Sequence, residues 1–138
     1  MPFVIEEKTG APQYQEPFIE DSLTGSLHVK VDVSTLTVAE VDRFGKIRPG
    51  TPLGEDGKRL TGVVGEYVRG VVPEAAQLVA ANPTNATLAA NTSDPFVGVG
   101  VIGVVDRDAV EANLGRVLSA EELAGFAHAK CKLVLSRY

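Results

Sequence analysis

The sequence predicts a β-rich α+β domain, and three features of the chain lead to this fold class. Residues 26–33 alternate strictly between apolar and polar side chains, which is typical of a strand with one buried face. Residues 96–105 form a continuous valine-rich apolar run, as expected for a strand buried on both faces. The pairs Pro49-Gly50 and Asp56-Gly57 have the composition of tight turns, so they divide the intervening chain into short extended pieces.

The overall composition suits one compact domain that does not bind nucleic acid. The chain has 138 residues, of which 44% are hydrophobic, and this is enough for a substantial core. Its formal net charge is −5, whereas binding to a phosphate backbone calls for a basic surface. The single cysteine, Cys131, cannot form a disulfide within the chain.

No membrane partner or export is expected from the sequence. The apolar run at 96–105 has about half the length that a membrane-spanning helix needs. The apolar start of the chain is interrupted by Glu6, Glu7 and Lys8, which a signal peptide does not tolerate. We therefore expect a soluble protein made in the cytosol.

The first 25 residues differ from the rest because they show neither a helical nor a strand period. Their prolines keep the chain extended, while their isolated large apolar residues suggest either a disordered terminus or an arm that orders on a partner. We therefore divide the chain into an N-terminal arm, residues 1–25, and a β-rich body, residues 26–138. The residues predicted to contact the partner are the arm's large apolar ones: Phe3, Val4, Ile5, Tyr14, Phe18 and Ile19.

The body begins with the alternating strand at 26–33, in which His28 is directed to solvent. The stretch 44–60 contains both turns and predicts a meander of strand, turn, strand, turn and strand. Residues 62–72 are expected to form one strand, or two with a glycine bend, that ends at Pro73.

The next two segments are less regular. Residues 74–81 fit either two helical turns, with Pro73 at the first helical position, or a loop followed by a strand. Residues 82–93 are small and polar, which predicts a surface loop.

The C-terminal part predicts two helices and a closing strand. Residues 106–113 are expected to form a helix with Asp108 as its cap and Gly115 as its end. The sequence from Ser119 to Glu122 is a capping box, which opens a second helix through about residue 129. Residues 132–136 close the chain as a strand.

The glycines of the 96–105 strand match the dinucleotide-binding pattern G-x-G-x-x-G at Gly98, Gly100 and Gly103. That motif works only at a strand-to-helix turn, where the helix N-terminus faces the pyrophosphate. Here the glycines lie inside an apolar run, so we expect them instead to let another backbone or sheet pack closely.

Other candidate sites are weaker still. Lys58 at a turn is reminiscent of lysines that carry lipoyl or biotinyl groups, but Arg59 follows it where those families have other residues. His128 and Cys131 have a spacing that metal ligands use, but a structural zinc site needs four ligands. No set of residues for nucleophilic or carboxylate catalysis is evident. We therefore predict that the protein is not an enzyme and has neither a cofactor nor a metal.

Four features of the chain together resemble the head decoration proteins of tailed bacteriophages, of the lambda type. Three of them are the extended N-terminal arm, the Gly-Val-rich strand and the closing strand with Lys132-Leu133-Val134-Leu135. The fourth is similar to the segment that opens the β-body in that family: Ile47-Arg48-Pro49-Gly50-Thr51-Pro52-Leu53-Gly54. The resemblance extends loosely over residues 26–136. Residues 106–130 depart from the shortest members and resemble an inserted helical segment.

The resemblance implies a small β-barrel or β-tulip-like body with one or two short helices. It also implies a virion protein that sits as homotrimers on the outer surface of the expanded head. There it would bind the major capsid protein, in part through the N-terminal arm, and cement the capsid. Two alternatives remain open: a small cytosolic β-barrel carrier, ligand-binding or enzyme domain, and another virion part such as a tail or head-completion protein.

Overall fold

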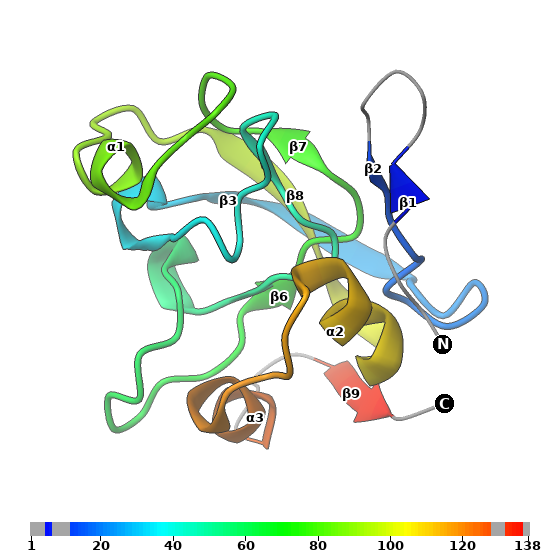
Figure 1. Cartoon of the computed structure of the whole chain (residues 1–138). Coiled ribbons are helices and arrows are strands. Elements are labelled where there is room, and N and C mark those ends of the chain that lie inside the picture. Colours follow the sequence, from blue (N-terminus) through cyan, green and yellow to red (C-terminus); the bar gives the residue numbers. More distant parts are fainter. Residues whose placement is uncertain (1–4, 7–11, 128–131, 137–138) are drawn as a thin grey trace.

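A computed structural model describes residues 5–6, 12–127 and 132–136, and it confirms the small α+β fold. In these residues one five-stranded sheet and two two-stranded sheets combine with three short α-helices (Figure 1). None of the helices in this part of the chain is long and apolar enough to cross a membrane.

The predicted buried strand is the centre of the main sheet. This strand, β8 (Phe96–Asp106), pairs antiparallel with β3 (Gly25–Lys30) along its first half. Its second half pairs parallel with β9 (Lys132–Ser136), which confirms the predicted closing strand. Strand β6 (Gly70–Val71) joins β8 at Gly100, and β5 (Pro52–Leu53) pairs with β6. Strands β3, β6 and β9 thus all pair with β8, and β5 joins the sheet through β6.

Strand β3 confirms the predicted alternation, since Leu27 and Val29 are half-buried while Ser26, His28 and Lys30 are exposed. The strand ends at Lys30, three residues before the predicted end. Val31 and Val33 are nevertheless fully buried, because the chain turns into the core through a 3₁₀ helix, η1 (Val33–Thr35).

Both predicted turns are present. Thr51 N–H donates to the Arg48 carbonyl across Pro49-Gly50, and Gly50 has φ +94°, as a type II turn requires. At the second turn, within η2 (Glu55–Gly57), Asp56 and Gly57 have φ of +60° and +69°, as in a type I′ turn.

The predicted meander is wrong, because the pieces between the turns pair with other segments. Strand β5 pairs with β6, and β4 (Lys46–Ile47) pairs with β7 (Ala76–Gln77). The second turn packs against the end of β3 and the residues after it: Gly57 lies against the Lys30 carbonyl, and Asp32 N–H donates to the Gly57 carbonyl. Strands of two residues have too little local pairing to form a hairpin alone, so burial of side chains decides their partners.

Residues 62–81 form less strand than predicted. Of the stretch 62–72, only β6 is a strand, and the preceding residues form a loop. Strand β7 shows that the loop-and-strand alternative for 74–81 holds and that the two helical turns do not. The predicted surface loop at 82–93 contains a short helix, α1 (Asn85–Ala89), with a Thr84–Thr87 capping box and with Leu88 buried in the core.

The two predicted C-terminal helices are α2 (Arg107–Leu114) and α3 (Ala120–Ala127). The cap of α2 is Asp106, whose side chain accepts from the Asp108 and Ala109 N–H groups, so the prediction of Asp108 was two residues late. Gly115 ends α2 with φ +72° as predicted, and Ser119 and Glu122 form the predicted capping box of α3.

These helices have a topological role. They connect β8 to β9, and parallel neighbours in a sheet require a crossover connection of this kind. The helical segment is therefore the connection that allows the closing strand to join the sheet.

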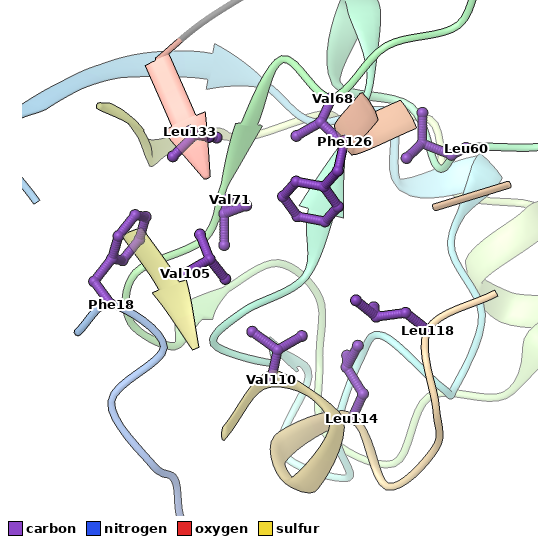
Figure 2. Packing of buried hydrophobic residues seen from close by; sticks show 10 residues of the cluster. All are labelled: Phe18, Leu60, Val68, Val71, Val105, Val110, Leu114, Leu118, Phe126 and Leu133. Carbon is purple, nitrogen blue, oxygen red and sulfur yellow. The ribbon is translucent and has the colours of Figure 1, made fainter. Parts of the chain in front are cut away.

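Two hydrophobic clusters fill the core. One lies between the second half of β8, the helices and the N-terminal segment, and Figure 2 shows ten of its side chains. The other lies under β3, β5 and α1 and includes Val31, Ile47, Leu53 and Leu88. Phe18 belongs to the first cluster, although it comes from the predicted arm (Figure 2).

Candidate functional site

The predicted partner-binding arm begins as a small two-stranded ribbon. Strands β1 (Ile5–Glu6) and β2 (Pro12–Gln13) pair antiparallel with each other. Within the described residues they form a sheet of their own, apart from the main sheet (Figure 1). A ribbon of two short strands is barely stable alone. In general, a partner can stabilise such a ribbon by adding a further strand to it.

The ribbon is joined to the body through Tyr14. The Tyr14 hydroxyl donates to Asp42 Oδ2 at 2.7 Å. The other carboxylate oxygen of Asp42 accepts from the backbone N–H groups of Phe44 at 2.9 Å and Lys46 at 3.0 Å. Asp42 is buried, so its fixed carboxylate holds Tyr14 against the turn before β4.

Gln15 is attached to α2 by a reciprocal pair of hydrogen bonds. Its backbone N–H donates to Asn113 Oδ1 at 2.7 Å, and Asn113 Nδ2 donates to the Gln15 carbonyl at 2.7 Å. Asn113 Nδ2 also donates to the Pro49 carbonyl at 3.1 Å. Because Asn113 is fully buried, its amide would be costly to leave unpaired.

Phe18 completes the attachment. Asp106 N–H donates to the Pro17 carbonyl and Ile19 N–H donates to the Val104 carbonyl, so Phe18 forms a bridge beside Val105. The ring is 5% exposed and lies over the glycines of β8. A Cβ built on Gly100 would come within 2.5 Å of the ring, and one on Gly103 within 2.8 Å. The expectation of close packing is thereby confirmed for Gly100 and Gly103, where the packed element is the N-terminal segment, mainly through side chains and not as a second sheet; at Gly98 it is wrong, because a Cβ there would meet no atom within 4 Å.

These contacts relocate the boundary of the arm. Residues 14–24 lie on the body, so the part that is separate from the body's sheets ends near Gln13 rather than at residue 25. Sequence reasoning missed this because the partners of Phe18 are glycines some 80 residues away, which no local pattern reveals.

The six predicted contact residues therefore have different places. Phe3 and Val4 lie outside the described residues, and Ile5 is on β1 with only its backbone described. Tyr14 and Ile19 are half-buried on the body, and Phe18 is in the protein's own core. Their contact with a partner stays a prediction, and for Phe18 it would require the ring to leave the core.

An open groove of about 690 Å³ borders the base of the ribbon. Its lining includes the segment 14–17, Pro49, Pro73 and Gly98 of β8. A Cβ on Gly98 would meet no atom within 4 Å. His28 lines the groove and is exposed, as the strand pattern predicted.

The other sequence candidates do not assemble into a site in the described residues. The three glycines of the dinucleotide-like pattern are all within β8 and not at a strand-to-helix turn. Lys58 is exposed beside the type I′ turn. His128 and Cys131 lie outside the described residues, and no metal-binding group of His, Cys, Asp and Glu is found among the residues described.

A buried charge cluster was not foreseen from the sequence. Arg116 donates to Glu122 through both terminal nitrogens, at 2.7 and 3.1 Å, and to Glu40 at 3.1 Å. Both carboxylates are almost completely buried. Burial raises the pKa of Glu122, but hydrogen bonds from Arg116 and Ser119 outweigh it and lower this pKa below its usual value. Hydrogen bonds with Glu122 raise the pKa of Arg116.

This cluster has a structural role, since it ties the start of α3 to the turn at 37–40. Its sequence signal was the capping box, which correctly placed Glu122 but gave no sign of Arg116 or Glu40.

Comparison with known proteins gives no family assignment: no family model, curated protein or solved structure matches this chain.

Proposed function

We propose that this chain is a structural, non-enzymatic decoration protein of a tailed-bacteriophage head. In this proposal it is made in the host cytoplasm, binds the major capsid protein on the outside of the expanded head, and cements the shell as homotrimers. The sequence resemblance suggests this role, and the small α+β body is compatible with it. The barrel-like closure that the resemblance implies remains part of the proposal.

The observation that most supports the proposal is the rigid base under the ribbon. Tyr14, Gln15 and Phe18 attach the ribbon's last strand to the turn before β4, to α2 and to β8. A partner that pairs with the ribbon would therefore be connected directly to the folded core. Through such a contact, a force on the capsid subunit would act directly on the folded body, as the role of a cement requires. A long flexible arm would not connect the two in this way.

The energetics of a shell favour such an arm. Ordering a short segment on a partner costs conformational entropy, which limits the affinity of one copy. Many copies on a lattice, each linked to its neighbours, gain apparent affinity without any new contact. The net charge of −5 is suitable for an outer-surface protein that does not bind the packaged DNA.

The carrier-domain alternative has one observation in its favour. Lys58 is exposed directly after a type I′ turn whose two central residues are fixed at positive φ. A mass increase on Lys58 in protein from its native host would support that alternative.

Co-sedimentation with purified expanded heads of the encoding phage tests the proposal. We expect saturable binding of the intact protein and heads that resist heat better. A variant lacking residues 1–12 keeps the anchor at Tyr14 to Phe18, so it should fold but lose binding. Absence of binding by the intact protein would overturn the decoration role, and full binding by the shortened protein would overturn the role of the arm.

A further inference from the structure

The groove at the base of the ribbon has rigid apolar groups in its lining. Three of these are prolines, Pro17, Pro49 and Pro73, whose rings lose no rotamer entropy when a ligand packs against them. The Tyr14 ring also lines the groove and is held in place by the hydrogen bond from its hydroxyl to Asp42. A ligand therefore binds here with little cost for ordering the protein.

Several backbone carbonyls beside the groove are already bonded within the protein. The Gln15 and Pro49 carbonyls accept hydrogen bonds from Asn113 Nδ2, and the Pro17 carbonyl accepts one from the Asp106 N–H. Recognition of a polar ligand group in the groove thus falls mainly to side chains.

Two carboxylates give the groove its electrostatic character. Glu16 and Glu74 line it and are both exposed. Its lining in the described part of the chain also contains His28, but neither lysine nor arginine. Within the residues described, neither glutamate side chain has an ion pair or a hydrogen bond. The groove is therefore complementary to a cation.

Both carboxylates project from fixed backbone. Glu16 lies between Gln15, which is bonded to Asn113, and Pro17, whose carbonyl is bonded to α2. Glu74 lies shortly before β7, which pairs with β4. A cation in the groove thus meets one carboxylate of the N-terminal segment and one of the body.

An arginine side chain is the cation that best fits this lining. Its apolar stem packs against proline rings while its charged head reaches the carboxylates. Its planar guanidinium also stacks on an aromatic ring such as that of Tyr14 and pairs with carboxylates through two hydrogen bonds, whereas a lysine ammonium is a compact point charge. The volume of about 690 Å³ leaves room for the residues that flank such an arginine.

We propose that the groove binds an arginine side chain on an extended segment of the major capsid protein, the segment that also pairs with the ribbon. This inference rests on the proposed function and adds the chemistry by which the partner is recognised. Glu16 and Glu74 select the cation, and Tyr14 and the three prolines hold the apolar part of the side chain.

Binding of a short peptide tests the groove without any phage component. The probe is capped at both ends and has an arginine between two prolines, which keep it extended. In the control peptide, citrulline replaces the arginine, so the shape is kept and the charge is lost. In NMR titrations of the natural protein, the arginine peptide should shift the amide signals of Gln15, Ala75 and Gly98, which line the groove. The citrulline peptide should bind about fivefold more weakly.

Two variants change the groove in different ways. E16Q/E74Q removes both carboxylates and should bind the arginine peptide about fivefold more weakly, since each exposed ion pair contributes little. The matched control E20Q/E55Q makes the same change in net charge at two exposed glutamates outside the groove, and it should bind as the natural protein does. G98V places a side chain where a Cβ meets no atom within 4 Å, so it should fold normally, fill part of the groove and lose peptide binding.

Expanded heads identify the source of the arginine. E16Q/E74Q should bind heads about fivefold more weakly, and E20Q/E55Q should bind as the natural protein does. Heads saturated with the natural protein are then treated with phenylglyoxal, which modifies accessible guanidinium groups, and digested for mass analysis. One arginine of the major capsid protein should be protected, and it should stay reactive on heads saturated with G98V, which binds through the ribbon alone.

The outcomes separate this inference from the proposed function. Equal binding of the two peptides, full peptide binding by G98V, undiminished binding of heads by E16Q/E74Q, or protection of no capsid arginine would overturn the inference while the decoration role stands. If the arginine peptide binds in the groove but the natural protein does not bind heads, the proposed function fails. That result would also overturn the capsid protein as the source, while the groove would remain an arginine site.

Discussion

The packing of Phe18 over the glycines of β8 predicts a measurable coupling between distant positions. Phe18 is 5% exposed, and burying a phenylalanine removes roughly 150–250 Å² from water. At about 25 cal/mol per Å² this corresponds to about 4–6 kcal/mol, of which alanine retains a part. Phe18→Ala should therefore lower the free energy of unfolding by about 3–5 kcal/mol. For 138 residues this is a fall in Tm of roughly 10–17 °C.

Gly100→Ala should also destabilise the folded protein, but by adding a group where the packing leaves no space. The new methyl group would lie 2.5 Å from the ring of Phe18 and 2.7 Å from Leu23, so it overpacks the site and costs about 1–3 kcal/mol. In the double variant the methyl group occupies space that the ring has left. The double variant should then be more stable than the sum of the two changes predicts, by about 1 kcal/mol or more.

Urea unfolding followed by circular dichroism measures these differences. Gly98→Ala is the matched control, because its Cβ would meet no atom within 4 Å and its backbone is extended, so its effect should be within about 0.5 kcal/mol. Phe18→Leu gives a milder change if the alanine variant does not fold. A cost below about 1 kcal/mol for Phe18→Ala, or strict additivity with Gly100→Ala, would refute the assignment of residues 14–24 to the body.

Three further predictions concern the charge cluster, the second turn and the ribbon. Because the pKa of Glu122 is lower in the folded than in the unfolded protein, its contribution to stability is present above about pH 4.5 and is lost as the pH falls through the folded-state pKa. Glu122→Gln should lower the free energy of unfolding by about 2–4 kcal/mol at pH 7 and weaken its decrease at acid pH, as measured by urea titrations at several pH values. An unchanged decrease of stability at acid pH would contradict the cluster's role. Gly57→Ala should cost roughly 2–5 kcal/mol in the same titrations, because Gly57 has φ +69° and its Cβ would overlap the Lys30 carbonyl; a neutral effect would show that the turn is not packed on β3. Deletion of residues 1–12 should change the free energy of unfolding in urea little, since the hydrogen bonds that attach the N-terminal segment to the body begin at Tyr14. A decrease of this free energy by more than about 2 kcal/mol would show that the ribbon supports the fold.

The parts of the fold that the sequence predicted are those with strong local signals. The alternation in β3, the valine run of β8, the capping box at Ser119 and the stop at Gly115 are all found in the structure. Each depends on interactions within one element or on a buried face with a clear period, so neighbouring residues contain the necessary information.

The errors fall where the decisive partner is distant in the sequence. Strands β4 to β7 have only two residues each, and their pairing follows burial of Ile47, Leu53 and Val71 rather than turn chemistry. Helix α1 was hidden because its capping box ends in Thr87 instead of the usual acidic residue or glutamine.

The candidate site was predicted in outline only. The odd composition of the first residues indicated a special role, but no pattern showed that Tyr14 would bind Asp42 or that Phe18 would lie on Gly100. Residues 62–66 were expected in a strand, because valines flanked by glycines fit that pattern equally well. In the structure they belong to a loop in which the backbone N–H groups of Thr61, Gly62 and Val63 donate to the Glu66 carboxylate.

Electron cryomicroscopy of expanded heads incubated with the protein tests the central claim most directly. The account predicts additional density on the outer surface, with the β1–β2 ribbon of each copy against a capsid subunit. Heads whose outer surface stays bare at saturating protein concentration would contradict the decoration role.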